Sequence, residues 1–171
     1  MKRAVITALL LFSVALPTSV LAKKKPAPVD IKSMSKVFIG WVDVNPEDYH
    51  MQGYASKQEW IDVISNANVN FQKNLGSGSA FSGKTVTGAK DRNDANTAGN
   101  DLYIKFSDVQ FDRKYRLHLA AHLIDLKTNA ELGTLPLGEY GGHFCTLSGC
   151  MDKELDEVNK ELQQLAGGSA K

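Results

Sequence analysis

The fold of this chain is decided by residues 102–126, which read LYIKFSDVQFDRKYRLHLAAHLIDL. Apolar and polar residues alternate over residues 102–106, and the alternation resumes on the opposite parity from Val109 onward. Such alternation is typical of a strand with one buried face. A β-bulge near Ser107 and Asp108 would return the second half of the strand to that same face. We therefore predict one long, bulged strand here.

Three further strands follow from similar patterns. Residues 115–126 carry leucine or alanine at alternate positions, residues 125–129 are typical of a turn, and residues 130–137 resume a strand pattern. Nearer the N-terminus, residues 36–44 are dense in β-branched and aromatic side chains, which indicates a buried strand.

Two helices are predicted from their capping signals and apolar spacing. The first begins after the capping residue Ser56, with Glu59 three residues on completing a capping box, and ends at Gly76. The second begins near Ser148 and carries an apolar stripe that runs to Leu165. The order strand, helix, three strands, helix predicts an α/β fold, a single mixed β-sheet with helices packed across it.

Residues 1–22 have the three parts of a cleavable signal peptide. Lys2 and Arg3 supply a positive start, an apolar run follows, and Ala22 precedes the expected cleavage point. The apolar run is shorter than a membrane-spanning helix requires, and no cysteine follows the cleavage point for lipid attachment. We therefore expect a periplasmic or secreted protein without a stable membrane anchor after cleavage.

The rest of the chain is expected to form one domain. Residues 23–35 are predicted to form a basic, proline-containing tether, residues 36–166 the α/β domain, and residues 167–171 a flexible tail. The full chain contains 20 Lys and Arg residues against 19 Asp and Glu residues. This near balance argues against nucleic acid as a partner, because nucleic-acid binding favours a basic face.

Both cysteines, Cys145 and Cys150, lie in one short segment near the second helix. In an oxidising compartment, an even pair predicts a disulfide. Their spacing differs from the Cys-x-x-Cys spacing of thioredoxin-type redox sites, so we expect a structural disulfide. A redox or metal-binding pair is the alternative.

Residues 76–100 form a long polar stretch, rich in Gly, Ser, Thr, Asn and Asp. A long segment without regular structure inside a compact domain is often functional. Its one large apolar residue, Phe81, and its one guanidinium, Arg92, are the candidate partner-binding residues, because aromatic and Arg side chains dominate interface energies. A loose hairpin and a merely disordered loop are the alternatives.

Part of this stretch, from Gly78 to Thr85, matches the written pattern of a phosphate-binding P-loop. Such a loop must follow a strand and open a helix, whereas this stretch follows the first predicted helix and leads into poor helix sequence. We therefore expect no nucleotide as a partner. Lys84 is placed in a solvated loop, so that a Lys84→Ala variant should keep its fold.

Signals for metal binding and catalysis are weaker. His118 and His122 would share a face on a helix, but on the predicted strand they lie roughly 13 Å apart, too far to bind one metal ion. With His143, they form the alternative metal or ligand site. The aspartates between Asp91 and Asp101 lack EF-hand spacing. No serine has the context of a nucleophile elbow, and no cofactor or catalytic set is predicted.

Residues 37–42, 115–132 and 140–144, together with the final helix, carry a family likeness. They resemble exported envelope proteins related to the curli-secretion lipoprotein and to the lipoprotein activators of penicillin-binding proteins, including a related family of unknown function. Residues 124–128 match the turn of these proteins, with Asn129 where glycine is usual. The resemblance implies an envelope protein that acts through contacts, with neither a cofactor nor catalytic residues.

These observations favour an exported, non-enzymatic envelope protein that binds another envelope protein or assembles with itself. The alternative is an exported metal- or ligand-binding protein that uses its surface histidines. An exported hydrolase ranks third, because no catalytic set stands out in the sequence.

Overall fold

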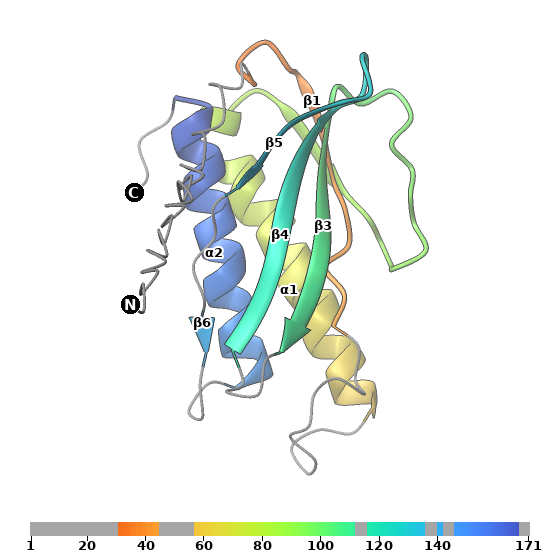
Figure 1. Ribbon diagram of the computed structural model, residues 1–171, viewed down its shortest axis with the longest axis vertical. Helices are drawn as coiled ribbons and strands as arrows, with labels where there is room; N and C mark the ends of the chain where they lie inside the picture. Colours follow the sequence, from red (N-terminus) through yellow and green to blue (C-terminus); the bar gives the residue numbers. More distant parts are fainter. Residues whose placement is uncertain (1–30, 45–56, 112–115, 136–139, 142–145, 168–171) are drawn as a thin grey trace, which may run out of the picture.

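The computed structural model of the chain describes residues 31–44, 57–111, 116–135, 140–141 and 146–167. The elements are β1 (Lys36–Ile39), α1 (Lys57–Ser77), the short 3₁₀ helix η1 (Ser79–Phe81), β2 (Thr85–Gly88), β3 (Leu102–Phe111), β4 (Arg116–Asp125), β5 (Ala130–Leu135), β6 (Tyr140–Gly141) and α2 (Leu147–Leu165) (Figure 1). The predicted signal peptide lies outside the described residues.

The strands form one mixed sheet in the order β2-β1-β3-β4-β5, and β6 pairs with β4. β1 is parallel to both β2 and β3, whereas β3, β4 and β5 are antiparallel neighbours. The predicted α/β class is confirmed, with one mixed sheet and the main order strand, helix, three strands, helix. The short strands β2 and β6 are additions to the predicted set.

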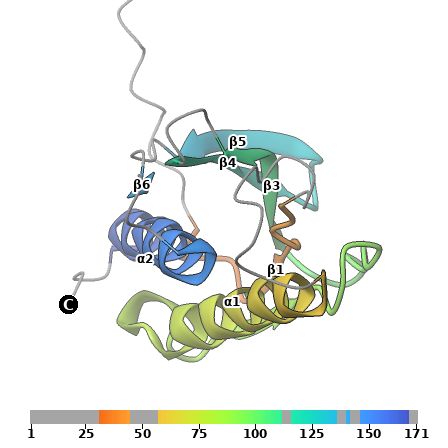
Figure 2. The ribbon, with the colours of Figure 1, turned by 90° about the horizontal axis from the view of Figure 1, so that it is seen from below.

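Both helices lie on the same face of the sheet (Figure 2). Alternate residues of β1, β3 and β4 point to this face and are buried with the apolar stripes of the two helices in one core. The largest fully buried side chains include Leu75, Leu102, Ile104, Leu117, Leu123, Met151 and Leu162. Neither described helix covers the opposite face of the sheet. Among the described residues, no helix has the length and apolar content that a membrane crossing requires.

The bulge predicted in the long strand is present in β3. The register against β4 shifts between Ser107 and Gln110, and Asp108 has a φ of 55°. Positive φ is uncommon outside glycine, but Asp is among the residues that adopt it more readily. The extra residue restores the inward face, because Phe106 and Val109 both pack against the core.

The first strand is shorter than predicted, because the expected strand covered residues 36–44 and β1 ends at Ile39. The buried Asn68 side chain accepts a hydrogen bond from the Val42 N–H at 2.8 Å and donates one to the Val42 carbonyl at 2.9 Å. The Trp60 indole donates to the carbonyl two residues further on. Side chains of α1 therefore satisfy this backbone in place of a neighbouring strand.

Residues 76–100 contain regular structure that the sequence interpretation missed. η1 follows α1 closely, and β2 pairs in parallel with β1 at the edge of the sheet. In the remaining residues 89–100, the carboxylates of Asp91 and Asp94 accept hydrogen bonds from backbone N–H groups of the same loop. The expectation of a long segment without regular structure is therefore wrong for residues 79–88.

The helix boundaries follow the sequence signals closely. α1 ends within one residue of Gly76, and α2 begins within one residue of Ser148. Thr146 caps α2, because its hydroxyl oxygen accepts a hydrogen bond from the Gly149 N–H at 3.1 Å. Ser56, the predicted cap of the first helix, lies outside the described residues.

Candidate functional site

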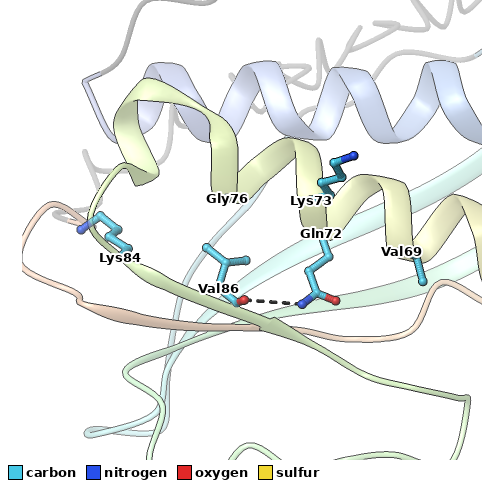
Figure 3. Close-up of a pocket in the computed structure, with 6 residues that line it drawn as sticks. All are labelled: Val69, Gln72, Lys73, Gly76, Lys84 and Val86. Carbon is cyan, nitrogen blue, oxygen red and sulfur yellow. Dashed lines mark hydrogen bonds between the residues drawn. The ribbon is translucent and has the colours of Figure 1, made fainter.

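A groove of about 370 Å³ lies between α1 and the edge strand β2. Its lining residues are Val69, Gln72, Lys73 and Gly76 of α1, together with Lys84 and Val86 at β2 (Figure 3). Val69 and Gln72 project from the helix toward the strand. The Val69 side chain is 58% exposed, so the groove offers an apolar contact that is open to solvent.

The backbone of β2 presents unpaired groups on the side of the groove. Thr85 and Ala89 donate their N–H groups to carbonyls of the β1 segment. Because successive residues of a strand point these groups to opposite sides, Val86 and Gly88 point theirs away from β1. Within the described part of the chain, neither of these two N–H groups donates a hydrogen bond, and the Val86 carbonyl accepts one long bond of 3.5 Å from Gln72. Such an edge is a template for another strand.

The lining of the groove carries positive charge. Lys73 and Lys84 line it, and none of the other lining residues is acidic. Lys73 is exposed on α1 and forms no ion pair with the residues that the structure describes. The groove therefore combines outward-facing strand N–H groups with an apolar contact. Lys73, whose side chain turns away from β2 in Figure 3, adds positive charge at the rim of the groove. Together these features suit an extended segment that carries a carboxylate.

Lys84 has a structural role that the sequence interpretation did not foresee. Its ammonium group donates hydrogen bonds to the backbone carbonyls of Ile31, Lys32 and Met34. A lysine ammonium has three donors, so each of them is engaged. The expectation of a solvated Lys84 is therefore wrong, because this side chain fastens the segment before β1 to the start of β2.

The P-loop pattern around Lys84 has the wrong surroundings for phosphate binding. It follows α1, contains η1 and leads into β2. A phosphate-binding loop instead follows a strand and opens a helix, whose N-terminal N–H groups meet the phosphates. The written motif therefore has no phosphate-binding geometry in this fold.

The two candidate partner-binding residues are not brought together. Phe81 is fully buried in the core, so its ring offers no surface to a partner, and its assignment as a contact residue is corrected. Arg92 forms an ion pair with Asp43 at 2.9 Å. The guanidinium therefore fastens residues 89–100 to the segment that follows β1.

The described histidines lie on β4 and point away from the helices. Because β4 is a strand, His118 and His122 are separated by roughly 13 Å and do not meet at one metal ion. Among the described residues, no group of three or more His, Cys, Asp or Glu side chains could hold a metal ion. His143 lies outside the described residues.

His122 is the centre of a hydrogen-bonded cluster on the open face of the sheet. Its Nε2 lies 2.8 Å from Ser107 Oγ, and its Nδ1 lies 2.8 Å from Glu131 Oε1. The Thr134 hydroxyl donates to the same Glu131 oxygen at 2.9 Å. The hydrogen bond to His122 is the main reason that the pKa of Glu131 is lowered, followed by the one from Thr134. We call these four residues the polar cluster.

The polar cluster lies between two irregularities of the sheet. β3 bulges after Ser107, and the register between β4 and β5 shifts between Leu123 and Ile124. Bulges re-aim side chains and are over-represented next to active sites. Lys105 is the β3 residue directly opposite His122, which places a cationic side chain beside the cluster.

The disulfide prediction involves one residue that the structure describes. Cys150 is fully buried in the first turn of α2. Cys145 lies outside the described residues, so the pairing of the two cysteines stays a prediction.

Comparison of the chain with protein-family models, with curated proteins and with solved structures found no match. The resemblance to envelope lipoproteins therefore stays a hypothesis. The groove and the polar cluster are the two features of the described residues that bear on function.

The sequence pointed to residues 76–100 as a binding region and to His122 as a possible ligand residue, but it predicted neither the groove nor the contacts of the polar cluster. The β-branched run Thr85-Val86-Thr87 is the one local signal that could have indicated β2. Its pairing with β1 could not be foreseen, because Thr87 meets Val37 across 50 residues of chain. The polar cluster forms only when β3, β4 and β5 pair in the observed register. The sequence around Ser107 therefore does not indicate that this serine contacts His122.

Proposed function

We propose that this chain is an exported envelope protein that binds an extended segment of another envelope protein at the edge of β2. The observation that carries the proposal is the pair of outward-facing N–H groups, at Val86 and Gly88, beside an open groove. In strand addition, main-chain hydrogen bonds supply affinity and contacts with alternate side chains supply specificity. The edge and the groove offer both kinds of contact.

The lining of the groove defines the chemistry of the segment. Val69 favours an apolar side chain in the partner, and the ammonium group of Lys73 favours a carboxylate. Lys84 adds positive charge although its donors are engaged. The partner segment is therefore extended, partly apolar and acidic, or it ends in a free C-terminal carboxylate.

Export is supported by residues 1–22, and the envelope location by the family resemblance. Protein recovered from the periplasm or the medium should begin at Lys23, which intact-mass analysis can determine. A chain that keeps residues 1–22 would contradict the export part of the proposal and leave the groove untouched.

The binding part is tested by photo-crosslinking in intact cells. A photoreactive residue in place of Val69 should capture one envelope protein, and a photoreactive residue in place of Lys160, exposed on α2, should not capture it. The second variant, Val86→Pro, removes the outward N–H group and replaces the partly buried Val86 side chain, which lines the groove, by an apolar ring. Proline is compatible with an edge strand. Val86→Pro should abolish capture at position 69 while thermal unfolding stays close to that of the unmodified protein.

Two results would contradict the binding proposal. Equal capture from positions 69 and 160 would show that the groove is not the contact surface. Undiminished capture by folded Val86→Pro would show that the main chain of β2 does not pair with the partner.

A further inference from the structure

Three members of the polar cluster have the arrangement of an activated nucleophile. Ser107 Oγ lies 2.8 Å from His122 Nε2, and the other ring nitrogen of His122 lies 2.8 Å from Glu131 Oε1. A hydroxyl, a base that it contacts, and a carboxylate that orients the base form the signature of nucleophilic catalysis, which is recognised by geometry and not by residue order. The three residues come from three neighbouring strands, β3, β4 and β5.

We propose that Ser107, His122 and Glu131 form a hydrolytic site for carboxylic esters on the helix-free face of the sheet. This activity goes beyond the proposed binding function, because it lies on a different surface from the groove. It also departs from the expectation that the chain is not an enzyme.

In the first step, Ser107 Oγ attacks the ester carbonyl carbon while its proton passes to His122 Nε2. The bond from the carbonyl carbon to the alcohol oxygen then breaks, and the alcohol leaves with the proton from His122, which gives an acyl group on Ser107. In the second step, a water molecule gives a proton to His122 and attacks the acyl group. The carboxylic acid leaves, and Ser107 regains its proton from His122.

Glu131 is a positioning residue in this scheme. It accepts a hydrogen bond at His122 Nδ1, which leaves Nε2 free to accept the Ser107 proton, and it stabilises the imidazolium that forms. Thr134 holds the same Glu131 oxygen in place. The pKa of Glu131 is lowered mainly by His122, so this carboxyl group is ionised near neutral pH.

Lys105 supplies charge for the transition state. It is the β3 residue directly opposite His122, two residues before Ser107 on the same face of the strand. A cation near the reacting carbonyl stabilises the negative charge that develops on its oxygen. Because the site lies on a sheet face that neither described helix covers, its substrate class is an ester group that projects from a larger molecule.

Asp108 competes for the hydroxyl proton of Ser107. Its Oδ2 lies 2.9 Å from Ser107 Oγ, so the hydroxyl donates either to this carboxylate or to His122 Nε2. Asn is a conservative replacement, because it tolerates the positive φ of this position. Asp108→Asn removes the charged acceptor and should raise the reactivity of Ser107.

The test uses the purified chain beginning at Lys23, with p-nitrophenyl acetate as the ester and a fluorophosphonate as a covalent probe. The chain should hydrolyse the ester above the buffer rate, and the probe should label Ser107, as located by peptide mass spectrometry. His122→Asn should lower kcat by about 100-fold, because a general base contributes at least that factor. Ser107→Ala should lose both signals, and Ser82→Ala, which alters an exposed serine, should lose neither.

The positioning role of Glu131 is tested separately, by kcat, KM and the rate of labelling. Glu131→Gln should lower kcat and the labelling rate with KM unchanged, whereas Asp108→Asn should raise the labelling rate. Thermal unfolding of each variant identifies any that fail to fold. The proposal is overturned if folded Ser107→Ala hydrolyses the ester as fast as the unmodified chain, or if the unmodified chain shows neither hydrolysis nor labelling at Ser107.

Discussion

The two halves of the sheet are held together in different ways. In the antiparallel half, β3, β4 and β5 pair with their neighbours in the chain. In the parallel half, β1 pairs with β2 across about 50 residues of chain, and single side chains secure the surrounding backbone. Asn68 holds the segment after β1, and Lys84 holds the segment before it. The antiparallel half therefore depends on many local pairings, and the parallel half depends on a few long-range contacts.

The largest effect is expected when residues 79–97 are replaced by a short Gly/Ser linker. A solvated loop could be replaced with little change in stability, but this replacement removes Phe81 from the core together with Lys84 and all of β2. We now predict loss of the cooperative thermal transition followed by circular dichroism. A replacement confined to residues 93–98 is the matched control and should keep the transition. An unchanged transition after the larger replacement would show that the parallel half is dispensable.

The next largest effect is expected for Asn68→Leu. The Asn68 side chain makes hydrogen bonds with Val42 N–H, the Val42 carbonyl and the Ile64 carbonyl, all in buried surroundings. Leaving buried backbone groups unpaired should lower the free energy of unfolding by about 3 kcal/mol in urea titration. Asn70→Leu, an exposed change on the same helix, should stay within about 0.5 kcal/mol of the unmodified protein. Equal losses for the two variants would be evidence against the Asn68 contacts.

A smaller loss is expected for Lys84→Met, which keeps the apolar stem and removes the three donors. The hydrogen bonds of Lys84 to Ile31 and Met34 are partly buried and the one to Lys32 is exposed, so the expected loss of unfolding free energy is about 1–2 kcal/mol. Lys90→Met, in the exposed loop, is the control and should have little effect. An equal free energy of unfolding for Lys84→Met and Lys90→Met would show that the hydrogen bonds of Lys84 do not stabilise the fold.

Contacts of Asp101 at the junction between the two halves make the stability of the fold depend on pH. Asp101 accepts hydrogen bonds from Ser35, just before β1, and from the N–H of Lys36, the first residue of β1. It also forms an ion pair with Lys127 at 3.0 Å. Lys127 is the first cause, and the Ser35 and Lys36 N–H groups are further causes, of a strongly lowered pKa of Asp101. A lowered pKa in the folded state means that the ionised carboxylate stabilises the fold above about pH 4, and that this stability is lost as the pH falls further.

The Asp101→Asn variant should therefore have a lower melting temperature than the unmodified protein at neutral pH. The two melting temperatures should converge as the pH falls below about 4. Thermal unfolding at several pH values measures both trends. A difference in melting temperature that does not change with pH would mean that the charge of Asp101 contributes nothing at this junction.

The contrast between the halves also explains what the sequence could predict. The bulge at Ser107 followed from a parity change between residues 106 and 109, because side-chain alternation is local. The end of β1 was predicted five residues too late, because the backbone of Val42 is satisfied by Asn68, a side chain 26 residues away. Phe81 was assigned to a surface because its polar surroundings gave no sign that the chain folds it into the core.

The candidate sites depend on contacts that a single strand does not specify. The alternation in β4 predicts that His122 faces away from the core, as it does. Its contacts with Ser107 and Glu131 require the registers of β3 and β5, both of which are shifted by irregularities. The groove likewise requires that β2 lie beside α1, which no local pattern in residues 76–100 indicates.

The central claim, that β2 is a sheet strand with an open outer edge, is tested most directly by amide hydrogen exchange in the free protein. Thr87 shares its orientation with Thr85 and Ala89, which donate to the β1 segment, whereas Val86 and Gly88 face outward. We predict slow exchange at Thr87 between two fast neighbours, Val86 and Gly88, and slowing of both neighbours when the partner segment binds. Slow exchange at all three amides of the free protein would contradict an open edge, and fast exchange at all three would contradict the pairing of β2 with β1.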